Sequence, residues 1–282
     1  MSRTVRAIHD SLRDDIGDLV TRRPLPGPRV PQIDPFLFLN HHGPQTYAPN
    51  NQGLPFGPHP HRGFETVTYM LDGRMQHRDN RGNTGDLGPG DVQWMTAARG
   101  IIHSEMPQQT QGRMRGFQLW LNLPARKKMK PAAYRDIAAG EIPVAEAGAG
   151  VRVRVIAGRF EHDGVVTDGA VRTAETDAHY FDVHLDAHAV LEAPLPREHN
   201  VFLYAYEGEA FGGASRSPLS QRTGAALSAG DVVRVEAGAE GARLLIIAGR
   251  PLGEPVVQHG PFVMNTREEI AQAIADYQAG TF

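Results

Sequence analysis

Two short stretches of the chain each carry a pair of potential metal ligands at positions i and i+2. The first is His59-Pro60-His61, and about forty residues later comes His103-Ser104-Glu105. Because successive side chains of an extended strand point to opposite faces, each pair projects from one face of its strand. Two such strands facing each other inside a small barrel would bring three imidazoles and a carboxylate to one point. The spacing therefore predicts a β-fold that closes around a metal site.

The composition agrees with a β-rich globular protein. A chain of 282 residues can form one large domain or two of ordinary size, and its 31 glycines and 21 prolines favour short strands joined by turns. The formal net charge is -3, with no basic run longer than 126–128, which argues against a dedicated nucleic-acid surface. Since the chain has no cysteine, disulfides and thiolate ligands are excluded, and a metal must bind nitrogen and oxygen.

No targeting or membrane segment is expected. The first residues lead into acidic side chains rather than an apolar stretch, so no signal peptide is predicted. No apolar run approaches the roughly 18 residues that a membrane helix needs. We therefore expect a cytoplasmic monomer with no membrane partner and no direct nucleic-acid partner.

Apolar runs and turn signals predict mostly strands. Asp72-Gly73 is a strong hairpin signal that would make 75–78 the return strand, and Gly43-Pro44 should end an earlier strand before a loop at 44–58. Near the C-terminus, Thr266 and Glu269 form a capping-box pattern, which predicts a helix over 266–278 on the outside of a barrel. The predicted strands are 18–21, 34–39, 65–71, 75–78, 92–95, 100–106 and 116–123.

The second half of the chain repeats the first in outline. Residues 69–73 are echoed by 204–208, and 87–92 by 227–232, which suggests a duplicated all-β unit. The second copy has Pro194-Leu195-Pro196 in place of the first histidine pair, so the site is predicted in one copy only. The basic, proline-bounded segment 124–131 is the expected boundary, which divides the chain into 1–130 and 131–282.

The types of ligand limit the choice of metal ion without identifying one. Imidazole and carboxylate donors suit iron(II), manganese, nickel, zinc or copper, and we expect Fe(II) because no hydrolase motif lies near the cluster. Four protein ligands on an octahedral metal would leave about two positions for water, substrate or dioxygen. Glu65 is an alternative to Glu105, because four residues after His61 an unbroken strand would turn it to the same interior. The residues themselves leave both carboxylates open.

The remaining histidines and basic residues receive simpler interpretations. His184 and His188 alternate with apolar residues and should lie on a solvated face, whereas His41 and His42 could line a pocket entrance. The run 126–128 with Lys130 is expected to be a solvated loop. No partner pattern is visible for His77, His162, His179, His199 and His259.

These motifs resemble a known family. The pattern Gly53-x5-His59-x-His61-x3-Glu65 resembles the first motif of the cupin superfamily, and the segment from Gly90 to His103 resembles the second, with Ala98 where a proline is usual. The residues at 59–67, 90–97, 116–120 and 258–266 are closer still to pirins. The resemblance covers nearly the whole chain. It implies a bicupin, with two antiparallel β-barrels, a metal in the N-terminal one and no metal in the C-terminal one.

The resemblance also implies the ligands and the activity. In pirins the two histidines of His-Pro-His and the His and Glu of His-x-Glu bind the metal; here they are His59, His61, His103 and Glu105. Bacterial pirins are described as quercetin 2,3-dioxygenases: a base removes the flavonol 3-hydroxyl proton, dioxygen adds across the central ring, and carbon monoxide is lost. Glu105 is the candidate base.

Two other functions stay open. Animal pirins are described as nuclear, iron-dependent transcription cofactors, which implies a non-enzymatic redox sensor that acts through a protein partner. A third possibility is a cupin whose substrate is a different small molecule.

Overall fold

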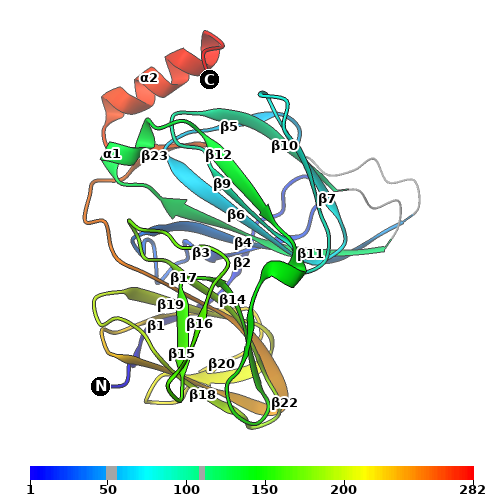
Figure 1. Cartoon of the computed structure of the whole chain (residues 1–282), viewed down its shortest axis with the longest axis vertical. Helices are drawn as coiled ribbons and strands as arrows, with labels where there is room; N and C mark the ends of the chain where they lie inside the picture. Colours follow the sequence, from blue (N-terminus) through cyan, green and yellow to red (C-terminus); the bar gives the residue numbers. More distant parts are fainter. Residues whose placement is uncertain (49–55, 108–111) are drawn as a thin grey trace. The chain divides into compact units, whose positions relative to one another are not determined.

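The computed structural model describes residues 1–48, 56–107 and 112–282, and most of its regular structure is β-strand (Figure 1). One antiparallel sheet has seven strands, which are β2 (Leu12–Arg13), β3 (Thr21–Leu25), β4 (Phe36–Tyr47), β6 (Phe64–Asp72), β9 (Val92–Thr96), β11 (Gly112–Asn122) and β12 (Ala133–Ile137). A four-stranded sheet contains β5 (His59–His61), β7 (Met75–Asp79), β8 (Thr84–Leu87) and β10 (Ile101–Pro107).

The largest sheet of the structure is antiparallel and has nine strands. Its nine strands are β1 (Val5–Asp10), β13 (Val144–Glu146), β14 (Val151–Ala157), β17 (His179–Leu185), β18 (Val190–Pro194), β19 (Asn200–Gly212), β20 (Ser217–Leu219), β21 (Thr223–Leu227) and β22 (Val232–Gly249). Two small hairpins and three helical segments complete the chain: β15 (Arg159–His162) with β16 (Val165–Asp168), β23 (Val257–His259) with β24 (Phe262–Met264), α1 (Ala125–Lys128), a 3-10 turn (Ala139–Glu141) and α2 (Arg267–Gln278).

The order of strands confirms the predicted duplication. The seven-stranded sheet runs β12-β9-β6-β11-β4-β3-β2, and the main path of the nine-stranded sheet runs β1-β21-β19-β22-β17-β14-β13. Each strand has its counterpart at the same place, so β6 matches β19 and β11 matches β22. The echo of 69–73 by 204–208 falls in this matching pair. The other pair of similar segments, 87–92 and 227–232, does not occupy matching positions. Gly90-Asp91 precedes β9, whereas Gly230-Asp231 precedes β22.

Contacts within the chain separate two compact units. The first barrel comprises 13–23, 36–139 and 252–282, and the second barrel comprises 1–12, 24–35 and 140–251. This division differs from the two continuous segments 1–130 and 131–282 expected from the sequence. The difference arises because β1 pairs with β21 in the second barrel, while the chain after residue 251 returns to the first.

The hairpin predicted at Asp72-Gly73 does not form. Strand β6 pairs with β9 and β11 in the seven-stranded sheet, whereas β7 pairs with β10 and β8 in the four-stranded sheet. The chain therefore leaves one sheet for the other at this turn, where Gly73 has a φ of 88°, a conformation that favours glycine. The four-stranded sheet has the order β5-β10-β7-β8 and supplies the strands of the candidate site.

Gly43-Pro44 does not end its strand. β4 continues to Tyr47, and its register with β11 shifts between Met114 and Gly116, which pair with Gln45 and His42. A bulge of this kind accommodates a proline that lacks a ladder donor. The strand predicted at 18–21 also differs, since β3 begins only at Thr21. Residues 49–55 of the predicted loop, Gly53 of the first motif among them, lie outside the described residues.

The predicted C-terminal helix is confirmed as α2. The Thr266 hydroxyl accepts from the Glu269 backbone N–H at 3.1 Å, and the Glu269 carboxylate accepts from the Thr266 N–H at 3.0 Å, so both halves of the capping box are present. Ile270 and Ala273 bury the apolar face against β24. Within the described part of the chain, neither helix has the length and apolar character needed to cross a membrane.

Lys128 departs from the predicted solvated loop. It ends the short helix α1 and is 1% exposed, because its ammonium donates to the carbonyls of Gly63 and Val263 and to the Asn122 side chain at 2.6, 3.0 and 2.6 Å. Burial lowers the pKa of Lys128 to about 8. The ammonium thus ties the turn after β5 to the C-terminal segment of the first barrel.

We expect Lys128→Met to lower the free energy of unfolding by about 1–3 kcal/mol, because three buried oxygens would lose their donor. Urea unfolding followed by circular dichroism measures this as a lower midpoint with an unchanged slope. Lys130→Met is the matched control at an exposed position and should shift stability by less than about 0.5 kcal/mol. Equal midpoints for both variants would show that the buried ammonium contributes nothing.

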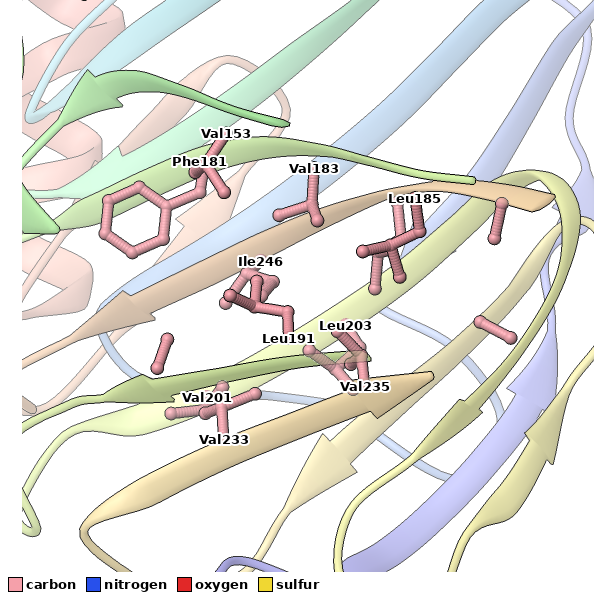
Figure 2. Close-up of a cluster of buried hydrophobic side chains, with 14 of the residues drawn as sticks. Val153, Phe181, Val183, Leu185, Leu191, Val201, Leu203, Val233, Val235 and Ile246 are labelled. Atoms are coloured by element: carbon pink, nitrogen blue, oxygen red, sulfur yellow. The ribbon is translucent and has the colours of Figure 1, made fainter. Parts of the chain in front are cut away.

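The interior of the second barrel is filled with apolar side chains (Figure 2). Leu191 and Ala193 of β18 lie in this cluster with their register partners on β22, Val235 and Val233. In the first barrel, by contrast, the paired strands β5 and β10 carry histidines. The second copy of the fold has thus kept the scaffold and filled its interior as an ordinary hydrophobic core.

Candidate metal centre

The two predicted ligand pairs lie on neighbouring strands. β5 and β10 are antiparallel partners in the four-stranded sheet, with His59 opposite His103 and His61 opposite Ile101. The strands therefore stand side by side in one sheet rather than facing each other across the barrel. Both still project their imidazoles into the same interior, because the i, i+2 spacing places each pair on one face.

The three imidazoles form one compact cluster. One ring nitrogen from each of His59, His61 and His103 lies within 4.8 Å of the other two. Among the described residues, these three histidines are the group whose ligand atoms lie close enough together to bind one metal ion. The Nδ1 atom of His59 lies 2.8 Å from the Gly57 carbonyl, which leaves Nε2 available as a ligand. The Nε2 atoms of His61 and His103 are buried and have no hydrogen-bond partner among the described residues.

Buried nitrogens without partners are costly, so such a cluster is typical of a metal site. Burial lowers the pKa values of His61 and His103 well below the ordinary value, and the neighbouring histidines lower them further. These two imidazoles are therefore neutral at neutral pH, the form in which imidazole binds a metal. The donor set fits a divalent transition metal.

Glu105 is buried beside the cluster and is held by hydrogen bonds from the opposite sheet. Its Oε1 accepts from the Thr68 hydroxyl and its Oε2 from the Gln118 amide, each at 2.8 Å. Thr68 and Gln118 pair in register on β6 and β11, and the Trp120 indole N–H donates to the Gln118 side-chain oxygen at 3.2 Å. This chain of donors fixes both carboxylate oxygens in place.

Glu65 lies away from the cluster. The chain is not one strand from His61 to Glu65, because β5 ends at His61 and β6 begins at Phe64 in another sheet. Along β6, Thr68 faces Glu105, so Glu65 projects to the other face, where it accepts from the Thr96 hydroxyl at 2.6 Å. Burial raises the pKa of the Glu65 carboxyl. The expectation that Glu65 shares the interior with the histidines is therefore wrong.

A cavity of about 400 Å3 opens beside the cluster. His59, His61 and Glu105 form one part of its wall, and Asn40 and Gln118 add polar groups. Its apolar lining is mainly aromatic and comprises Ile16, Phe38, Phe56, Pro58 and Trp120. The volume falls in the roughly 300–1,000 Å3 range of small-molecule sites, so the candidate ligands face a space that a substrate could enter.

Arg62 anchors the turn that follows the first ligand pair. Its guanidinium lies 2.7 Å from the Asp276 carboxylate of α2 and 4.3 Å from the centre of the Phe282 ring. The hydrogen bond from Arg62 keeps the pKa of Asp276 below its usual range. The C-terminal helix thus holds the backbone that carries His59 and His61.

Other histidines differ from their sequence interpretations. His41 and His42 are buried in β4; His42 contacts Phe56 of the cavity wall at 5.6 Å between ring centres, and burial lowers its pKa to about 4. His188 is exposed as expected, but His184 bonds to the fully buried Asp182 at 3.1 Å. His77, for which no partner was predicted, lies against His103. The alternation of buried Met75 and His77 in β7 was the available signal.

Comparison with known proteins identifies the family. The family model described as "Pirin" matches residues 18–121, and the model described as "Pirin C-terminal cupin domain" matches residues 180–282. The chain belongs to the pirin family. A Pseudomonas aeruginosa protein, named provisionally as a quercetin 2,3-dioxygenase, is 51% identical over 261 residues, which cover 92% of this chain and 90% of that protein.

Two solved structures that are similar to this chain confirm the bicupin fold. A structure described as quercetin 2,3-dioxygenase from Acinetobacter baumannii has a TM-score of 0.92 and 33% identity, covering 100% of this chain and 99% of that one. A bacterial pirin from Escherichia coli, solved in complex with nickel(II), has a TM-score of 0.66 and 20% identity, covering 87% of this chain and 99% of that one. Two cupin barrels followed by a C-terminal helix are thus shown for this pirin.

Proposed function

We propose that this pirin is an iron-dependent dioxygenase that opens the ring of quercetin or a related flavonol. In this proposal His59, His61 and His103 hold Fe(II), with Glu105 as the fourth protein ligand. The observation that supports it most strongly is the cluster of three buried imidazoles at a cavity of about 400 Å3. The relatives named for quercetin 2,3-dioxygenase supply the substrate class.

The cavity suits a flat aromatic substrate. Phe38 and Trp120 lie against each other with ring centres 4.8 Å apart, and Phe56 adds a third aromatic side chain to the wall. Aromatic side chains favour offset or tilted contacts with another ring, so a flavonol gains both area and orientation here. The amides of Asn40 and Gln118 can bind its hydroxyl groups.

Glu105 is the proposed base. Because Thr68 and Gln118 hold its two oxygens, the carboxylate is oriented before substrate arrives and can accept the proton of the flavonol 3-hydroxyl. A bound metal would lower the pKa of that hydroxyl and orient the flavonol against dioxygen.

The identity of the metal ion is tested by comparing iron and nickel directly. Imidazole and carboxylate donors accept nickel, manganese, zinc and copper as well as iron, and the related bacterial pirin from Escherichia coli was solved with nickel(II). We propose Fe(II) because the relatives named for quercetin 2,3-dioxygenase imply a reaction with dioxygen, which suits a redox-active metal. Parallel loading with Fe(II) and Ni(II) separates the two ions by their turnover.

The test is anaerobic reconstitution with Fe(II), followed by quercetin and dioxygen. We expect metal-dependent loss of flavonol absorbance with release of carbon monoxide, and we expect His59→Ala to lose this turnover. Stoichiometric iron binding without turnover would overturn the proposal and favour an iron-binding redox sensor that acts through a protein partner. Turnover that persists in His59→Ala would place the reaction at another site.

A further inference from the structure

We propose that His77 is a positioning residue that holds the His103 imidazole in the tautomer whose Nε2 atom is free to bind the metal. The inference rests on the proposed metal site and adds a residue to it. His77 lies on β7, where it pairs in register with Glu105, and its side chain is fully buried. The Nδ1 atoms of His77 and His103 are 3.3 Å apart, and their ring centres are 5.1 Å apart.

A hydrogen bond between two Nδ1 atoms requires one donor and one acceptor. A neutral imidazole carries a proton on one nitrogen only, so the ring that donates through Nδ1 has a bare Nε2. If His103 donates, its bare Nε2 lies in the ligand cluster, ready to bind a cation. If His103 accepts instead, its proton is on Nε2 and points at the place of the metal. The two arrangements therefore have opposite consequences for metal binding.

The surroundings favour donation by His103. The Nε2 atoms of His103 and His77 are both buried without a partner among the described residues, so a proton on either Nε2 is unpaired. Donation by His103 is favoured because His103 belongs to the ligand cluster and His77 does not, and a bound cation requires a bare nitrogen on His103. His59 shows the same arrangement in unambiguous form, since its Nδ1 faces the Gly57 carbonyl, which can only accept. A hydrogen bond from the outer nitrogen of a metal-binding histidine is the usual means of fixing its tautomer.

The His77 ring is itself held in place. Tyr134 of β12 packs on it with ring centres 5.3 Å apart, and Glu105 pairs with it in register across β7 and β10. The acceptor is therefore a fixed atom rather than a mobile side chain. Removing it would leave the Nδ1 proton of His103 without a partner and would free the ring to rotate away from the cluster.

A pair of variants separates this hydrogen bond from simple packing. His77→Leu keeps an apolar side chain of similar size without an acceptor, whereas His77→Asn places the amide oxygen where Nδ1 stands, because both atoms are bonded to Cγ. We expect His77→Leu to weaken Zn(II) or Fe(II) binding about 10–100-fold and His77→Asn to restore most of the loss. Anaerobic competition with a chelator measures the affinities. Equal affinities for the wild type and His77→Leu would overturn the proposal, as would equal weakening in both variants.

His199→Leu is the matched control, because His199 is a buried histidine of the second barrel. It should leave metal affinity unchanged. A second readout needs neither metal nor turnover: long-range 1H–15N spectra of the metal-free protein report which nitrogen of His103 carries the proton. We expect Nδ1 in the wild type. Protonation at Nε2 would overturn the inference even if metal binds, whereas a wild type that binds no metal would contradict the proposed site alone.

Discussion

Replacing His103 by alanine is expected to abolish tight metal binding while leaving the fold intact. His103 supplies one of the three clustered nitrogens, and its loss should exceed the roughly 100-fold penalty for removing an outer hydrogen bond from a ligand. The fold should persist because the sheet contacts of β10 are made by its backbone with β5 and β7. Metal content after dialysis and far-ultraviolet circular dichroism give the two readouts.

A buried histidine elsewhere provides the comparison for this result. His199→Ala removes an imidazole of similar burial from the second barrel, so it should reduce stability without changing metal content. Unchanged metal content in His103→Ala would reject the proposed site. Loss of metal in both variants would indicate a general effect of destabilisation, and the unfolding midpoints of the two proteins would reveal it.

The sequence predicted the strands well because side-chain alternation is a local property. The prediction failed for strand pairing, because the partner of a strand depends on the whole fold. Asp72-Gly73 has the composition of a hairpin turn, yet β7 pairs with β10 from a different sheet. Gly43-Pro44 has the composition of a strand end, yet β4 absorbs it as a bulge, since β11 continues to pair on the far side.

The candidate site was predictable for a related reason. The i, i+2 pairs needed only local strand geometry, and the structure brings His59, His61 and His103 together. Glu65 was misplaced because the change of sheet between His61 and Phe64 breaks the alternation on which the prediction relied. His77 was missed because its alternation with Met75 in β7 indicates only that it faces the interior, and its partner His103 lies 26 residues along the chain.

Lys128 shows that local composition does not always predict burial. A basic run between prolines usually forms a solvated surface, and two of its three members follow that rule in not being buried. Lys128 is buried because three oxygens converge on it from segments distant in sequence, including Val263 of the C-terminal region. The sequence contains no sign of that convergence, which exists only once the first barrel has closed.

The second prediction with a large effect is that Glu105→Gln lowers kcat for quercetin by about 10²–10⁴, the usual contribution of a general base. The amide oxygen can still accept from Thr68, which holds one end of the side chain, whereas the amide nitrogen can no longer accept from Gln118. It cannot take the proton of the flavonol hydroxyl at neutral pH. Steady-state kinetics at saturating Fe(II), with metal content measured on the same samples, give the result. A kcat equal to that of the wild type would exclude Glu105 as the base.

Glu65→Gln is the matched control for Glu105→Gln, because Glu65 is also buried but faces Thr96 on the other side of β6. Because Glu65 projects away from the imidazoles and does not line the cavity, activity should change little. The dependence of Glu105→Gln on metal concentration then separates two roles. If Glu105 acts chiefly as a ligand, excess Fe(II) restores kcat, because only metal affinity was lost. If Glu105 is the base, kcat stays low when every site is filled, since the missing proton acceptor belongs to the chemical step.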